Sequence, residues 1–181
     1  MDTYKLKFTK LQNEIFRLFC IKAGESLNHR GIARLLEVSP TAVAKALPLL
    51  EKEKLLVSNK MREFNFVSVK FNRENQGAIE MKRVENLRFI YEKRLNSYME
   101  ECFPGCTIIL FGSYAHGEDT IDSDIDLAVI GSKPKNVKFS KFEKVLERKI
   151  NLNFYSALKD IDTELKENIL NGITLAGGIE L

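Results

Sequence analysis

The segment FGSYAHGEDTIDSDIDLAVI, residues 111–130, decides how the second half of this 181-residue chain is built. A short apolar run, residues 106–111, ends here in the pair Gly112-Ser113. Glycine lets the backbone approach an anion closely, and Ser113 offers an N–H and a hydroxyl as donors. Residues 114–118 can add a helical turn whose N-terminus carries partial positive charge. The turn therefore predicts a phosphate-binding site.

The next predicted strand adds two carboxylates to this site. Side chains alternate between the two faces of a strand, so Asp124 and Asp126 share one face of the run DIDLAVI, residues 124–130. Two carboxylates this close repel each other, and a bound cation removes the repulsion. The pair therefore predicts a magnesium site beside the phosphate turn. The alternative is an exposed sheet edge whose charges discourage aggregation, but an edge needs neither the Gly-Ser pair nor the fixed separation.

Gly112-Ser113, ten further residues and Asp124-x-Asp126 resemble the pattern of the polymerase-beta-like nucleotidyltransferases, and the short tail resembles their minimal branch. The resemblance covers residues 100–175. It implies a mixed sheet flanked by helices, with two magnesium ions held by three carboxylates. The implied reaction transfers a nucleotide, AMP from ATP, to a hydroxyl of a protein or small molecule. Some members of the minimal branch are antitoxins that adenylylate a HEPN-class toxin, so such a toxin is a candidate partner.

The chain departs from this pattern at the third carboxylate, which the family carries on a later strand. The matching run here is INLNFY, residues 150–155, where Asn151 is the best match and Asn153 the second. An amide can offer its carbonyl oxygen to a metal, but it carries no charge and is a poor base. The expected metal ligands are therefore Asp124, Asp126 and Asn151, and deprotonation of the acceptor hydroxyl is the step in question.

One histidine and three carboxylates lie between the two motifs. His116 stands where many family members carry arginine, and it either contacts phosphate or lies in a solvated loop. Glu118, Asp119 and Asp122 are expected in a solvent-facing loop. The alternative is that one of these three carboxylates replaces the missing base.

The first part of the chain has the pattern of a winged helix-turn-helix. The predicted elements are helices over residues 8–22, 28–37 and 40–52, followed by strands over 54–60 and 63–70. Residues 28–57 resemble winged-helix transcription regulators. The resemblance implies that helix 40–52 enters the major groove of duplex DNA with Thr41 and Lys45. It also implies that Lys60 and Arg62 on the wing contact phosphates. The alternative is a module used only for protein contacts.

Charge supports a division into parts with different partners. Residues 1–75 carry 14 Lys/Arg against 8 Asp/Glu, whereas residues 76–181 carry 14 against 17. The basic first part favours double-stranded DNA as its partner. The expected α+β architecture is a winged helix-turn-helix domain over 1–72, a linker helix over 73–101 and a nucleotidyltransferase fold over 102–181.

The linker is expected to be one long helix with an apolar stripe. The stripe steps by three or four residues through Val84, Leu87, Tyr91, Leu95, Tyr98 and Cys102. It packs either within its own chain or against a second copy, which would make a homodimer.

The remaining composition indicates a cytoplasmic protein without membrane contact, because no run of 18 apolar residues and no charged-then-apolar leader is present. Three cysteines without zinc spacing are expected to be free thiols. Three functions compete. They are a magnesium-dependent nucleotidyltransferase that also binds DNA, a DNA-binding regulator whose impaired transferase domain senses nucleotide or dimerises, and a structural adaptor.

Overall fold

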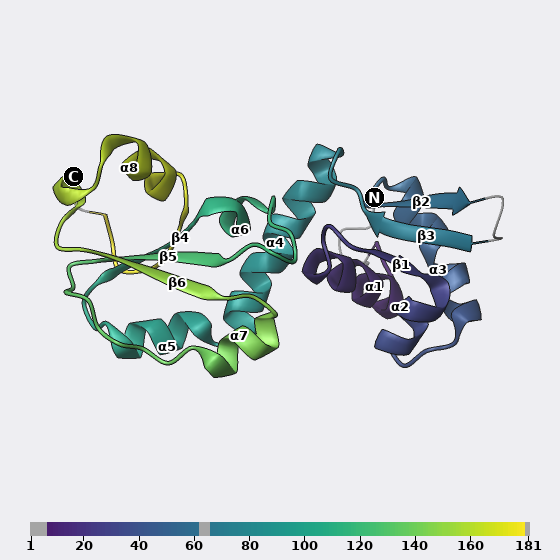
Figure 1. The fold of residues 1–181 in the computed structure, drawn as a ribbon, viewed down its shortest axis with the longest axis horizontal. Coiled ribbons are helices and arrows are strands. Elements are labelled where there is room, and N and C mark those ends of the chain that lie inside the picture. The colour runs from purple at the N-terminus through teal and green to yellow at the C-terminus, as the bar shows by residue number, and fades with distance from the viewer. Residues whose placement is uncertain (1–6, 62–65, 180–181) are drawn as a thin grey trace. The chain divides into compact units, whose positions relative to one another are not determined.

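The computed structural model describes residues 7–61 and 66–179, and the chain divides into two compact units, Met1–Ile79 and Glu80–Leu181 (Figure 1). In the described residues, no helix is both long and apolar enough to cross a bilayer. The three cysteines are free, with Cys20 buried and Cys102 and Cys106 partly buried, as expected from their spacing.

The N-terminal unit is a winged helix-turn-helix. Its elements are α1 Lys10–Ile21, β1 Ser26–Asn28, α2 His29–Leu35, α3 Pro40–Lys52, β2 Leu56–Met61 and β3 Phe66–Phe71. The three strands form an antiparallel sheet in the order β1-β3-β2, so the β2–β3 hairpin is the wing. The three helices and the hairpin agree with the sequence prediction. Strand β1 was not predicted, because three residues are too short to show alternation.

Side-chain caps start each helix of this unit. Thr9 and Gln12 form a capping box at α1, and the Asn28 side chain accepts a hydrogen bond from the Gly31 N–H at 2.7 Å before α2. Ser39 accepts one from the Ala42 N–H at 3.1 Å, with Pro40 in the first helical position of α3.

The core of this unit is apolar and closed. Each of the three helices buries one face, and the rest of the core comes from β3 and from Ala23, Leu55, Leu56 and Ala78. The fully buried members include Ile15, Phe19, Ile32, Val43, Leu50 and Val69, all at 0% exposure. Helix α3 continues through Pro48 to Lys52, so the proline does not end it.

The C-terminal unit is a four-stranded mixed sheet with helices on both faces. After α4 Gln76–Glu92 and α5 Leu95–Cys102, the elements are β4 Thr107–Phe111, α6 Gly112–His116, β5 Ile125–Ile130, α7 Ser140–Leu146, β6 Ile150–Tyr155, η2 Leu158–Asp160, α8 Thr163–Leu170 and β7 Ile173–Ala176. The strand order is β6-β5-β4-β7, with β5 and β6 parallel and the other pairs antiparallel. Figure 1 shows α5 and α7 on one side of the sheet and α8 on the other.

The range predicted as one linker helix contains two helices. Helix α4 ends at Glu92, and Arg94 adopts a left-handed conformation with φ 60° before α5 starts at Leu95. Because of this break, α5 buries Leu95 and Met99 on a face that does not continue the buried face of α4. A left-handed residue is uncommon outside glycine, so the periodicity of the apolar residues gave no sign of the break.

The predicted apolar stripe is wrong for α4. Val84 is 60% exposed and Tyr91 is 45% exposed, whereas Lys82 and Ile90 are both fully buried at 0%. Hydrophobic periodicity assigns a lysine to the surface, and it fails here because Lys82 meets a buried carboxylate, Asp119.

Apolar residues at helical spacing over residues 157–172 predict one amphipathic helix, but the structure does not form a continuous helix there. A single 3₁₀ turn, Leu158–Asp160, is followed by Ile161 in an extended conformation, and α8 runs only from Thr163 to Leu170. Ile161 and Ile169 lie in the core beside β4 as predicted, whereas Leu170, which was also predicted to face inward, is 39% exposed.

Candidate active site

The turn between β4 and α6 places a glycine directly beside a carboxylate. Phe111 pairs with Asp126 across β4 and β5, so Gly112 follows at the level of Asp126. Gly112 has φ +73°, and a Cβ built on it would lie 2.8 Å from Asp126 Oδ2. Only a residue without a side chain fits here, in both conformation and space. The chain thus brings the glycine of the turn and the second aspartate together.

The two aspartates meet at one side chain of the neighbouring strand. Asp126 is the register partner of Asn151 in the parallel β5–β6 pair. Asn151 Nδ2 lies 2.9 Å from Asp124 Oδ2 and 3.4 Å from Asp126 Oδ1, and it donates to both carboxylates. Both aspartate side chains therefore project toward Asn151, on the same side of the sheet. The arrangement follows from alternation on β5 and from the register with β6.

The electrostatics of this group favour added positive charge. Burial raises the pKa of Asp126 and the charge of Asp124 raises it further, whereas the hydrogen bond from Asn151 opposes both. One neutral amide is a weak counterpart for two carboxylates. The folded chain therefore holds two negative groups together at a free-energy cost that a cation would offset.

The donor atoms suit a hard divalent cation. Carboxylate oxygens are the ligands that magnesium prefers, and the site offers them from Asp124 and Asp126. Within residues 7–61 and 66–179, no group of three or more His, Cys, Asp or Glu side chains is placed to hold a metal. Asn151 turns its amide nitrogen, which is not a metal ligand, toward the carboxylates. The two carboxylates beside the Gly112-Ser113 turn therefore suit a divalent cation that takes its remaining ligands from another molecule.

The other predicted residues of the turn lie on α6. Ser113 is the second residue of this five-residue helix and His116 is the last, and both are partly buried. The carbonyl of Ser113 accepts a hydrogen bond from the Glu118 N–H at 3.0 Å, which ties the turn to the loop that follows. Asn153, the second match to the missing carboxylate, pairs with Ala128 and so lies two residues further along the sheet.

An open cavity gives Asp124 access to solvent. Its volume is about 580 Å³, and it extends from Asp124 to the turn before β6. The charged residues along it are Asp122, Asp124, Glu143, Glu147, Arg148 and Lys149. A second reactant can therefore reach Asp124 through this cavity.

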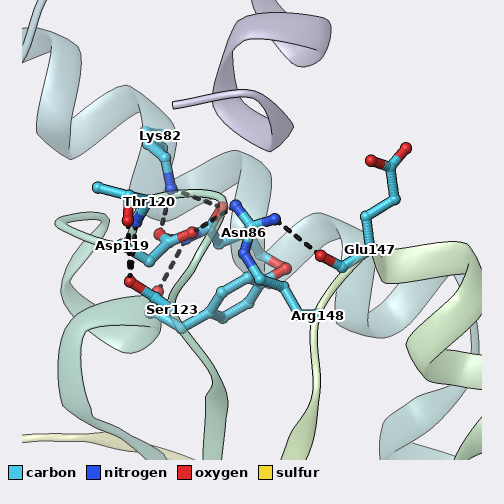
Figure 2. A network of polar contacts seen from close by, with 8 residues as sticks. Lys82, Asn86, Asp119, Thr120, Ser123, Glu147 and Arg148 are labelled. Atoms are coloured by element: carbon cyan, nitrogen blue, oxygen red, sulfur yellow. Dashed lines mark hydrogen bonds and ion pairs between the residues drawn. The ribbon is translucent and has the colours of Figure 1, made fainter. Parts of the chain in front are cut away.

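Asp119 does not lie in a solvent-facing loop. Glu118 and Asp122 are exposed as expected, but Asp119 is only 1% exposed. Figure 2 shows its carboxylate among three side chains from other parts of the unit. Oδ1 pairs with Lys82 and accepts a hydrogen bond from Asn86 Nδ2 at 2.7 Å, and Oδ2 pairs with Arg148 Nη2 at 3.2 Å. A carboxylate held in this way is a poor candidate for the missing base.

We name Lys82, Asn86, Asp119 and Arg148 the Asp119 cluster. Sequence reasoning missed all four residues as a group. The one available signal was the four-residue spacing of Lys82 and Asn86, which places them on the same face of a helix. No sequence pattern predicts that Lys82 contacts Asp119 or that Asp119 contacts Arg148, because these partners are 37 and 29 residues apart in the chain.

The DNA-facing residues predicted on α3 are accessible. Thr41 and Lys45 are exposed and lie one helical turn apart, on the face opposite the buried Val43 and Leu47. Lys60 lies in β2, but its side chain is outside the described part of the structure, as is the whole of Arg62. The two wing contacts therefore remain predictions.

Comparison with known families agrees with the geometry of the C-terminal unit. Residues 92–175 match the model of the nucleotidyltransferase domain. The match spans β4 to β6, and so it contains the Gly112-Ser113 turn, both aspartates and Asn151. This part of the chain therefore carries a nucleotidyltransferase domain. No curated protein matches the chain.

Solved structures similar to this chain include a repressor and a zinc-responsive regulator. The adhesin competence repressor AdcR of Streptococcus pyogenes is 19% identical over 54% of this chain and 69% of its own, with a TM-score of 0.41. The zinc-responsive MarR-family member ZitR of Lactococcus lactis is 28% identical over 54% of this chain and 62% of its own, with a TM-score of 0.39. A ZitR variant in complex with DNA gives 26% identity, the same coverage and a TM-score of 0.39. Because these scores are low, the winged helix-turn-helix is assigned from its own elements and sheet order.

Proposed function

We propose that the C-terminal unit binds a nucleoside triphosphate with Mg²⁺ and transfers its nucleotide to a hydroxyl group, and that the N-terminal unit binds duplex DNA. The observation that carries the first part is the approach of Gly112 to Asp126, which brings an anion-binding turn against a carboxylate pair. ATP is the expected triphosphate. A protein acceptor, including a HEPN-type toxin, is suggested by the family resemblance alone.

Each residue of the site has a distinct task in this proposal. Asp124 and Asp126 would hold the magnesium, which when bound would polarise the reacting phosphate and neutralise the pyrophosphate that leaves. Ser113 would donate its N–H and hydroxyl to phosphate oxygens. Gly112 keeps the backbone close enough for this contact without blocking Asp126. The cavity beside Asp124 would admit the acceptor hydroxyl.

The transfer is tested with ATP labelled on the α-phosphate. The full chain is incubated with Mg²⁺ and with candidate protein or small-molecule acceptors, and labelled product is measured. The double variant Asp124→Asn/Asp126→Asn keeps the size of both side chains and removes both charges, so it should abolish transfer. Product that forms equally well with this variant would refute the role of the pair. No transfer by the wild-type chain to any acceptor would favour the second candidate below.

The second candidate is a DNA-binding regulator that binds nucleotide without turning it over. Asn151 favours it, because it stands opposite Asp126 and donates to both carboxylates instead of adding a third charge. Thermal unfolding with ATP and Mg²⁺ would then show stabilisation of the wild-type chain without product. Asn151→Asp should create or accelerate transfer if the missing charge is the only defect. Transfer by the wild-type chain that is unchanged in Asn151→Asp would reject this candidate.

Binding of the N-terminal unit to DNA is tested with duplex at low and moderate salt. Thr41 and Lys45 lie on the exposed face of α3. Lys45→Ala should weaken binding, and the slope of log affinity against log salt should fall by about one if its contact is with a phosphate. Lys22→Ala, on a basic residue that follows α1, is the matched control and should keep that slope. Absence of duplex binding at low salt would leave the winged helix as a module for protein contacts.

A further inference from the structure

The Asp119 cluster joins the three chain segments that carry the site. Asn86 Nδ2 donates to Tyr114 O at 2.9 Å as well as to Asp119 Oδ1, and Tyr114 directly follows Ser113. Arg148, which pairs with the other oxygen of Asp119, stands three residues before Asn151. Asp119 itself stands five residues before Asp124. Every segment that brings a polar group to the site is therefore bonded to the cluster within a few residues of that group.

The loop from Asp119 to Asp124 has little freedom. Thr120 N–H donates to Ser123 Oγ at 2.9 Å, and Ser123 N–H donates to Thr120 O at 3.0 Å, which closes a tight turn just before Asp124. At its other end, the Ile125 N–H donates to Lys149 O at 2.8 Å, next to Arg148. Movement of Asp119 would therefore be transmitted to Asp124.

Because the cluster is buried, breaking one of its contacts destabilises the folded chain. Lys82 is 0% exposed, Asp119 1% and Arg148 5%. Charges at this depth persist only with partners, and removal of one partner leaves the others uncompensated. A simple apolar contact could have held the loop, yet the chain uses one carboxylate with two separate oxygens, each directed to a different element (Figure 2).

We propose that Asp119 is a positioning residue that sets Asp124 and Asn151 relative to the Gly112-Ser113 turn, so that its carboxylate determines how tightly the site binds a triphosphate with Mg²⁺. This inference rests on the proposed nucleotide-binding site. Asp119 contacts neither phosphate nor cation in it. It acts through α4 on one side, by Lys82 and Asn86, and through the start of β6 on the other, by Arg148.

The test compares binding with stability in the full chain. Asp119→Asn keeps the shape of the side chain and removes its charge. Affinity for fluorescently labelled ATP with Mg²⁺ is measured well below the unfolding transition of every variant, and thermal unfolding is recorded in parallel. We expect Asp119→Asn to weaken binding about tenfold or more, which corresponds to about 1.4 kcal/mol. Arg148→Lys keeps the charge but not the forked guanidinium, and should weaken binding less.

Two controls separate positioning from general destabilisation. Met99→Ala truncates a fully buried residue of α5 and should lower the melting temperature without changing the affinity. Asp160→Asn makes the same change at an exposed position outside the cluster and should bind as the wild type. Wild-type affinity in Asp119→Asn, or an equal loss in Met99→Ala at matched stability, would overturn the proposal.

A second measurement needs no ligand. It tests the positioning role even if Asp119→Asn is too unstable for binding experiments, and even if the wild-type chain binds no nucleotide. Hydrogen exchange is compared between wild type and Arg148→Lys in the absence of nucleotide. Faster exchange in residues 120–126, with β7 unchanged, supports the positioning role. Unchanged exchange in 120–126 rejects it. Failure of the wild-type chain to bind ATP with Mg²⁺ would count against the proposed function alone.

Discussion

Position 112 requires glycine for two reasons, its left-handed φ and the lack of space for a side chain. Gly105 is a control that separates these two reasons. Gly112 and Gly105 both have left-handed φ, +73° and +76°, but only Gly112 has a neighbour within reach of a built Cβ, namely Asp126 Oδ2. Gly112→Ala and Gly105→Ala should each lose about 1–2 kcal/mol from backbone strain. Only Gly112→Ala should also lose stabilisation by ATP with Mg²⁺, measured as the ligand-induced shift in melting temperature. An equal ligand response in both variants would contradict the close packing of turn and carboxylate.

We expect the Asp126 carboxylate to lower the stability of the folded chain at neutral pH and to be needed for cation binding. Burial and the charge of Asp124 raise its pKa, so the folded chain holds this proton more tightly than the unfolded chain does. Stability from this group is therefore greatest at acid pH and falls as the pH rises from the unfolded to the folded pKa. At neutral pH without divalent cations, Asp126→Asn should melt at a higher temperature than the wild type. It should also lose the stabilisation by Mg²⁺ with ATP.

The control for Asp126→Asn is Asp160→Asn, which removes an exposed carboxylate. It should change neither property. A series of unfolding curves from pH 4 to pH 8 checks the sign, because the advantage of Asp126→Asn should grow with pH. A wild-type chain that becomes relatively more stable as the pH rises would contradict the electrostatic cost assigned to Asp126.

Strand alternation, a local rule with a fixed period, placed Asp124 and Asp126 on one face, and the family resemblance added Asn151 from a later strand. Local rules did not predict that Asp119 is buried, because its burial depends on partners far along the chain, Lys82 and Arg148. Composition assigns an acidic loop residue to solvent, and only the three-dimensional contacts reverse that assignment.

The break between α4 and α5 shows how one residue shapes two elements. Arg94 holds φ 60° without a side-chain capping bond, while its N–H donates to Tyr91 O at 3.0 Å and its carbonyl accepts from Tyr98 N–H at 3.1 Å. A non-glycine residue pays a strain of roughly 1–2 kcal/mol in this conformation. Arg94→Gly should therefore stabilise the chain by up to about 1 kcal/mol, because the more flexible unfolded glycine offsets part of the gain.

The matched variant Arg94→Ala removes the same side chain but keeps the strain. It should show no gain in chemical denaturation, so the difference between the two variants reports the backbone alone. Greater stability of Arg94→Ala than of Arg94→Gly would instead show that the chain prefers a continuous helix through this position.

Helix positions were predicted best where a cap marks the start. Helix α3 begins at Pro40 after Ser39 and runs to Lys52, the predicted range. The C-terminal helix was predicted poorly, since Ile161 packs into the core from an extended segment between η2 and α8. Apolar spacing located Ile161 and Ile169 in the core, but it did not show whether the backbone between them is helical.

At the scale of the whole molecule, α4 belongs to both units. Ala78 is fully buried in the core of the N-terminal unit, and Lys82, one helical turn later, is fully buried in the Asp119 cluster of the C-terminal unit. We expect a ligand that changes the position of Asp119 to change the affinity of the N-terminal unit for its own ligand, and the reverse must then hold to the same extent.

This coupling is expected to appear as a change in duplex affinity when ATP and Mg²⁺ are added, of about 5-fold or more if the coupling has the usual size of 1–3 kcal/mol. The double variant Glu80→Gly/Met81→Gly loosens the turn between the two anchors at exposed positions, at a cost of about 1 kcal/mol for each glycine. It should reduce the coupling while each ligand alone still binds. Glu80→Ala/Met81→Ala removes the same side chains, keeps the helix and should retain the coupling. If both variants couple as the wild type does, the helix is not the path of the coupling. If ATP with Mg²⁺ leaves the duplex affinity of the wild-type chain unchanged, the two units act independently on their ligands.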